Sequence, residues 1–198
     1  MKDIIRKNEV IKMNDPEQLK RIAVNEKDSN ILLAWAKNPH VSEEGLLVGF
    51  RFFKNDLNDN QNPTDYANFL FRKKEFIVAI LEHSNCPDEI FHDVHEILFL
   101  KRKTNEINEE LAKEYIAQTF VKHAPMDLAI DVLKKYHKRT RLILPEFIER
   151  LESCQMTEVE QKKVWSFLSK IETKQIISSF YTHPENQNFW SLLPKALL

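Results

Sequence analysis

Residues 15–42 read DPEQLKRIAVNEKDSNILLAWAKNPHVS and give the clearest local evidence for the fold class. The stretch opens with an aspartate, a proline and a glutamate. This order is typical of the first turn of a helix, where proline lacks an amide that would have no partner and an acid complements the helix dipole. Asn38 and Pro39 interrupt the next apolar run before another helix begins. The stretch therefore predicts short helices joined by proline and asparagine turns.

Turns of this kind recur along the chain. In each turn, the end of one helix is followed by a polar residue and a proline. Acidic residues and an aliphatic residue then open the next helix. The intervals from Pro39 to Pro87, from Pro87 to Pro125 and from Pro145 to Pro184 are all roughly 40 residues, a period typical of two-helix solenoid repeats. We expect ten or eleven helices. The start of one of them is marked by Thr157 and Glu160, which have the spacing of a capping box.

The run from Asp15 to Ala23 and the run from Leu33 to Ser42 together resemble the helical repeat of HEAT-like and leucine-rich-repeat-variant solenoids. Those repeats commonly carry an Ala-x-Asn-Pro turn before a second helix, as at positions 36–39 here. The resemblance is clearest over residues 15–50. It implies an all-α fold, an α-solenoid-like stack of about four to five antiparallel helical hairpins that forms a single helical-repeat domain over residues 1–198. It implies no particular chemistry, because such solenoids serve many roles.

Composition supports the helical prediction. The chain of 198 residues contains only two glycines, Gly45 and Gly49. Tight β-hairpins and phosphate-binding loops usually need glycine, which tolerates positive φ. A chain almost without glycine is therefore expected to lack both, and no glycine-rich nucleotide motif is present.

Charge and cysteine content bear on partners and location. The chain has 29 basic and 30 acidic residues, so no single-signed field favours nucleic acid or a membrane surface. No apolar stretch approaches the roughly 20 residues of a spanning helix, and the N-terminal residues do not resemble a signal peptide. Two cysteines, Cys86 and Cys154, form no disulfide framework. We expect a cytoplasmic protein with reduced thiols, no membrane contact and no cofactor.

A polar connector is expected at residues 55–65, which read NDLNDNQNPTD. Asp56, Asn58 and Asn60 match the first three ligand positions of a calcium loop. The glycine and the bidentate glutamate that such a loop needs are absent. We interpret the segment as a solvated connector that ends in a helix cap at Thr64 or Asp65.

One group of residues has the chemistry of a zinc site. It contains His83, Cys86, His92 and His95, and the last two are expected on one side of a helix because they are three residues apart. Their spacing matches no standard zinc motif, so Cys86, His92 and His95 are weak metal candidates. The histidines are expected at the polar edge of the helix. Two interpretations of Cys86 are open. Its place close to a helix N-terminus could lower the pKa of its thiol, or the residue could serve only in packing.

A basic run, KKYHKRTR, covers residues 134–141. Cations of this kind can meet phosphates while an aromatic side chain stacks on a base, and they also favour helix C-termini as a solvated face. Shorter runs at 72–74 and 101–103 would extend a basic stripe if they lie on the same side. The candidate residues for binding nucleic acid or an acidic partner are Lys134, Lys135, Tyr136, Lys138, Arg139 and Arg141.

No catalytic motif stands out in the sequence: there is no GxSxG, no P-loop and no singled-out carboxylate pair. The first hypothesis is therefore a non-enzymatic protein-binding module, of adaptor, inhibitor or immunity type, that uses a groove between stacked helices. The alternative is a nucleic-acid-binding HEAT-like protein that uses the basic run at residues 134–141.

Overall fold

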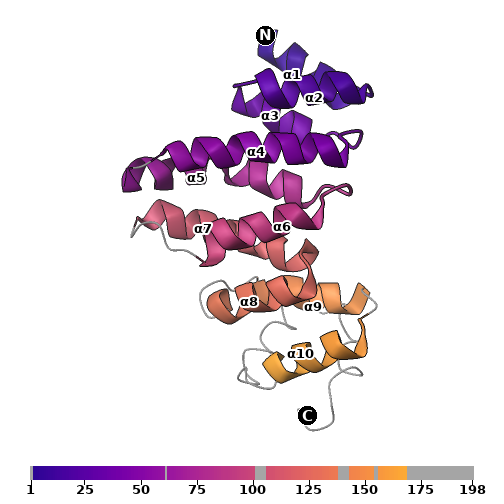
Figure 1. Cartoon of the computed structure of the whole chain (residues 1–198), viewed down its shortest axis with the longest axis vertical. Coiled ribbons are helices and arrows are strands. Elements are labelled where there is room, and N and C mark those ends of the chain that lie inside the picture. Colours follow the sequence, from indigo (N-terminus) through magenta and orange to yellow (C-terminus); the bar gives the residue numbers. More distant parts are fainter. Residues whose placement is uncertain (1, 61, 101–105, 138–142, 154–155, 169–198) are drawn as a thin grey trace. The chain divides into compact units, whose positions relative to one another are not determined.

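The computed structural model describes residues 2–60, 62–100, 106–137, 143–153 and 156–168 (Figure 1). These residues form ten α-helices and one π-helical segment, and they contain no β-strand. The prediction of an all-α fold is therefore confirmed. Among the helices described, none combines the length and the apolar character needed to cross a bilayer.

The chain divides into two compact units, residues 1–116 and residues 117–198, which we describe separately. Unit 1 contains α1 (Lys2–Lys12), α2 (Pro16–Asn25), α3 (Ser29–Ala36), α4 (Glu43–Asp59), α5 (Pro63–Leu81), α6 (Asp88–Val94), the π-helical segment η1 (His95–Leu100) and the start of α7 (Ile107–His123). Unit 2 contains the end of α7, then α8 (Met126–Tyr136), α9 (Ile143–Ser153) and α10 (Glu158–Leu168).

In unit 1 the first helices pack on their next-but-one neighbours along the chain. Contacts join α1 to α3, α2 to α4 and α3 to α5, and α2 and α4 also touch the helix that follows each of them. The core of this unit is apolar and largely aromatic. Trp35 is fully buried and stacks on Phe76, with 6.3 Å between the ring centroids. Burial of these large side chains is the main source of the unit's stability.

Gly49 lets α4 pack against the indole of Trp35. A Cβ atom at this position would lie 2.8 Å from Trp35 Cζ3 and closer still to Cη2, whereas at Gly45 the nearest atom, Val41 Cγ1, would be 3.2 Å away. Neither glycine has a positive φ. Gly49 is therefore required for close approach between helices and not for backbone freedom.

The turn between α3 and α4 is built around Asn38, which is completely buried. Its amide nitrogen donates to the carbonyls of Val10 at 2.6 Å and Met13 at 2.8 Å, and its side-chain oxygen accepts from the amide of His40 at 2.8 Å. The carbonyl of Val10 also accepts from the amide of Met13 at 3.3 Å, at the helix end where the regular backbone bonds of α1 stop. The asparagine of the Asn-Pro turn therefore satisfies an earlier helix end.

The expected connector at residues 55–65 is shorter in the structure. Helix α4 continues through Asp59, so only residues 60–62 separate it from α5. Asn62 caps α5 by accepting from the amides of Thr64 at 2.9 Å and Asp65 at 3.4 Å. The predicted cap at Thr64 or Asp65 was wrong by two or three positions, because Pro63 already occupies the first helical position.

An ion pair is buried in unit 1. Lys113 Nζ lies 2.5 Å from Glu109 Oε1, one turn apart on α7, and the side chains are 1% and 0% exposed. Tyr66 is also buried, and burial together with the charge of Glu109 raises the pKa of its hydroxyl above the ordinary range. Removal of either partner of an ion pair buried from solvent leaves the other charge uncompensated and destabilises the fold.

Unit 2 packs α8 against both α9 and α10. Tyr136 and Phe147 are fully buried in its core. Lys122 bridges Glu146 at 3.2 Å and Glu149 at 3.3 Å, which connects the end of α7 to α9.

The predicted capping box at the start of α10 is confirmed. The amide of Thr157 donates to Glu160 Oε2 at 2.8 Å, and the amide of Glu160 donates to Thr157 Oγ1 at 3.3 Å. The two bonds satisfy amides that α10 cannot satisfy itself.

Candidate functional site

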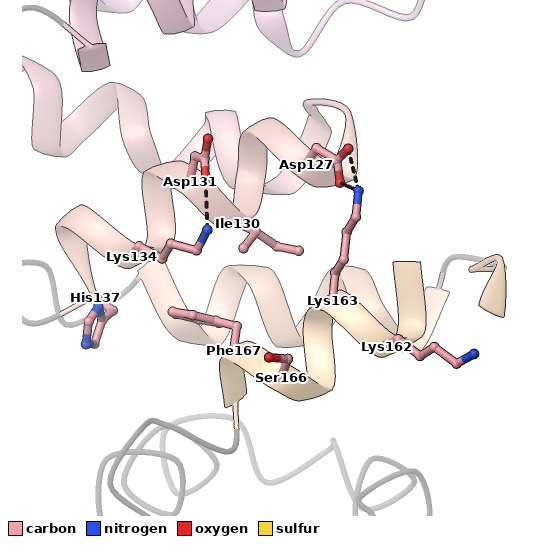
Figure 2. Close-up of a pocket in the computed structure, with 9 residues that line it drawn as sticks. All are labelled: Asp127, Ile130, Asp131, Lys134, His137, Lys162, Lys163, Ser166 and Phe167. Atoms are coloured by element: carbon pink, nitrogen blue, oxygen red, sulfur yellow. Dashed lines mark hydrogen bonds and ion pairs between the residues drawn. The ribbon is translucent and has the colours of Figure 1, made fainter. Parts of the chain in front are cut away.

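A surface groove of unit 2 lies between α8 and α10 and has a volume of about 680 Å³ (Figure 2). We call it the α8–α10 groove. Its lining residues come from both helices and from the residue that follows α8. They are Asp127, Ile130, Asp131, Lys134, His137, Lys162, Lys163, Ser166 and Phe167.

The base of the groove is apolar. Ile130 of α8 and Phe167 of α10 are 5% and 8% exposed, and Figure 2 shows them between the charged side chains. The imidazole of His137 meets the ring of Phe167 edge-on, at a centroid distance of 5.8 Å and an angle of 87°. His137 Nδ1 lies 2.9 Å from the carbonyl oxygen of Leu133. A carbonyl only accepts, so Nδ1 carries the proton.

The edges of the groove carry paired charges. Lys163 Nζ of α10 lies 2.7 and 2.8 Å from the two carboxylate oxygens of Asp127 on α8. Lys134 Nζ lies 3.0 Å from Asp131 one turn earlier on α8. These side chains are about half exposed, so each pair contributes little to stability. Acidic and basic side chains therefore alternate along the edges of a groove whose floor is apolar.

The basic run at residues 134–141 separates into different environments. Lys134 lines the groove, whereas Lys135 is exposed with its Nζ 5.7 Å from the ring centroid of Tyr136. Tyr136 is 0% exposed, so its ring presents no face to solvent in this structure. Its position on α8 faces the core. Lys138, Arg139 and Arg141 lie outside the described residues.

The basic runs at 72–74 and 101–103 form no continuous basic stripe within the described residues. Lys73 hydrogen-bonds Ser29 Oγ, and Lys74 lies over the ring of Phe71, so neighbours in the run at 72–74 make different contacts. The run at 101–103 lies outside the described residues.

The histidine and cysteine group does not come together. His92 is exposed, while His95 is 7% exposed, so the expectation of two solvated histidines on one polar edge was wrong for His95. His92 lies in α6, whereas His95 is the first residue of the π-helical segment η1, so the α-helical spacing that places residues three apart on one side does not continue between them. No set of three or more His, Cys, Asp or Glu side chains within the described ranges is placed to hold a metal ion.

His83 has a structural position between two turns. Its Nε2 lies 2.8 Å from the carbonyl oxygen of Asn38, and its Nδ1 accepts from the amide of Asn85 at 3.0 Å. The carbonyl requires the proton on Nε2, which leaves Nδ1 as the acceptor that the amide needs. Both ring nitrogens are therefore engaged by backbone groups.

Cys86 is not an activated thiol. Burial, with a smaller contribution from the charge of Asp88, raises the pKa of its thiol to about 12. The lowered pKa considered from its place before a helix is therefore wrong, because desolvation outweighs the dipole of a helix only seven residues long.

Most residues of the groove are not predicted by the sequence. Asp127, Asp131 and Lys134 recur at intervals of four and three residues, which predicts that they share one face of a helix. That signal was present in the sequence. The approach of Lys163 and Phe167 from α10 had no local signal, since it depends on how two helices pack.

A comparison of the chain with protein-family models, with curated proteins and with solved structures finds no match.

Proposed function

We propose that this chain is a non-enzymatic protein-binding module, and that the α8–α10 groove is where it holds its partner. The observation that carries the proposal is the combination of an apolar floor with alternating acidic and basic side chains at the edges of the groove. Protein interfaces have this composition, with an apolar centre inside a polar rim. An adaptor, inhibitor or immunity-type role fits a site of this kind.

The charges favour a protein over a nucleic acid as the occupant. Of the three lysines that line the groove, Lys134 and Lys163 are already paired with carboxylates of α8. A strand of nucleic acid would bring its phosphates close to these acids, and electrostatic binding of phosphates needs unpaired cations. The nucleic-acid alternative, built on residues 134–141, also loses Tyr136 as a stacking surface.

A stack of helical hairpins of the HEAT-like kind is part of the proposal. Its support is the packing of α1 on α3, α2 on α4 and α3 on α5, since each hairpin in such a stack covers its neighbour. We place the protein in the cytoplasm on the grounds of its cysteine usage.

The test uses a photo-crosslinking amino acid in place of Ser166, which lines the groove. The same residue in place of Asn25, an exposed position at the end of α2, is the matched control. We expect the groove position to crosslink one discrete protein in native extract with or without nuclease, and the control position to crosslink none.

A charge swap shows whether the groove itself selects that protein. The double variant Asp127→Lys with Lys163→Asp keeps an ion pair between α8 and α10 but reverses its direction. We expect the double variant to keep the circular dichroism spectrum and lose the crosslinked protein. Retention of the same crosslink would reject the groove as the binding site, and crosslinks that disappear with nuclease would favour the nucleic-acid alternative.

A further inference from the structure

A second recess, of about 220 Å³, lies in unit 1 and is lined by residues of α2 to α5 and of the α2–α3 turn. We call it the phenylalanine cavity, after Phe52, Phe53, Phe69 and Phe76 in its lining. The ring of Phe53 packs on Phe69 and Phe76 at centroid distances of 5.8 and 6.2 Å. A protein cavity of about 150 Å³ holds benzene, so this one has room for a single aromatic ring.

Lys73 brings an amine to this apolar wall. Its Nζ donates to Ser29 Oγ at 2.9 Å and lies 5.9 Å from the centroid of Phe69. Burial lowers the pKa of the Lys73 ammonium, and the charges of Asp56 and Asp28 only partly oppose this. More of this side chain is therefore the neutral, nucleophilic amine near pH 7 than for an ordinary lysine.

The remaining charges around the cavity favour a neutral ligand. Its lining contains two acids, Glu26 and Asp56, and two bases, Lys27 and Lys73. Glu26 is already engaged: Oε1 accepts from the amides of Lys27 and Asp28 at 2.9 Å, and Oε2 lies 2.8 Å from Arg6. The acids and bases balance, so neither a carboxylate nor an ammonium ligand would find a net opposite charge.

We infer that the phenylalanine cavity binds a small neutral aromatic aldehyde and that Lys73 holds it as a reversible imine. The ring of such a ligand packs against the phenylalanines, and its carbonyl carbon lies at Nζ. This inference is independent of the α8–α10 groove, which belongs to the other unit.

The reaction balances without any other reactant. The lone pair of the neutral Nζ forms a C–N bond as the carbonyl π bond opens, and one proton moves from nitrogen to oxygen to give a carbinolamine. The second nitrogen proton leaves with that oxygen as water, and the C=N bond forms. Addition of water reverses both steps, so the aldehyde is held and released.

The test treats the full chain with benzaldehyde and cyanoborohydride near neutral pH, which reduces an imine to a stable benzylamine, and locates the adduct by peptide mass spectrometry. Lys74 is the internal control, because its Nζ lies outside the cavity, 3.8 Å from the centroid of Phe71. We expect at least about tenfold more labelling of Lys73, the factor that 1.4 kcal/mol of apolar contact supplies.

Two comparisons separate cavity binding from a reactive amine alone. Acetaldehyde has no ring, so its preference for Lys73 over Lys74 should be several-fold smaller. Val24→Phe adds bulk at an exposed lining position and should reduce the labelling of Lys73 by benzaldehyde but not by acetaldehyde. Equal labelling of Lys73 and Lys74 by benzaldehyde, or an equal preference for both aldehydes, would overturn the inference. Lys73→Arg should remove the adduct, and Lys74→Arg should leave it unchanged.

Discussion

The Nε2 atom of His83, in the turn after α5, lies 2.8 Å from the carbonyl oxygen of Asn38, in the turn after α3. A second bond runs in the same direction, from the side-chain Nδ2 of Asn85 to the carbonyl oxygen of Val41 at 2.9 Å. Asn38 in turn bonds backward to the end of α1. Successive proline-containing turns of unit 1 are thus joined by side-chain bonds to backbone carbonyls.

We predict that Asn38→Ala destabilises unit 1 by about 2–4 kcal/mol, since it removes the hydrogen bonds of a fully buried side chain to the carbonyls of Val10 and Met13 and from the amide of His40. Urea unfolding followed by circular dichroism measures the change. Asn85→Ala is the control: it removes one bond at an exposed position and should cost much less. An equal loss in the free energy of unfolding for the two variants would show that the burial of Asn38 does not increase the contribution of its hydrogen bonds.

The two glycines of α4 should respond in opposite directions to alanine. Helix propensity alone favours alanine over glycine by about 1 kcal/mol. We expect Gly45→Ala to be neutral or stabilising and Gly49→Ala to be destabilising by about 1–3 kcal/mol, because its new methyl group meets Trp35. Trp35→Phe should cost less in the Gly49→Ala background than in the wild-type chain. Thermal unfolding of the wild type, the two single variants and the double variant measures this coupling.

The buried pair in α7 depends on both its charges. Lys113→Met should destabilise the protein by about 3–5 kcal/mol, because it leaves the carboxylate of Glu109 buried without its ammonium. The double variant with Glu109→Gln should recover part of this loss. If the double variant is no more stable than Lys113→Met in urea unfolding, the cost comes from lost packing and not from the unpaired charge.

Cys86 should react slowly with thiol reagents. Its pKa of about 12, against an ordinary 9.0, leaves far less thiolate at pH 8, and we expect a rate at least about a hundredfold below that of a free thiol. The test uses Cys154→Ser protein with a disulfide reagent. The rate should keep rising with pH through pH 10, and a plateau near pH 9 would contradict the raised pKa.

The capping box should make α10 sensitive to acid. Hydrogen bonds from the hydroxyl and amide of Thr157 lower the pKa of Glu160 below 4.5. A lowered folded-state pKa contributes stability above the unfolded pKa, and that contribution is lost as pH falls through the folded value. Amide exchange in the first turn of α10 should therefore be faster in Glu160→Gln than in wild type at neutral pH, and the difference should shrink as the pH falls below 4.5 and the carboxylate of Glu160 is protonated. A difference that persists in acid would show that the charge is not responsible.

The helical class and several helix ends could be predicted from local sequence patterns alone. Scarce glycine, apolar spacing and proline turns are local properties, and so is the capping box of Thr157 and Glu160, whose partners lie three residues apart. Even the shared face of Asp127, Asp131 and Lys134 follows from helical geometry. Each of these features depends only on interactions between residues that are close together in the sequence.

Which of these residues share a site depends on the packing of helices that are distant in the sequence. The run at 134–141 reads as one basic patch, yet Lys134 lines a groove and Tyr136 is in the core, because adjacent residues of a helix point about 100° apart. Lys163 meets Asp127 and Lys73 reaches the phenylalanine cavity only because separate helices pack together. Such contacts depend on the shapes of distant side chains, which no local pattern of the chain specifies.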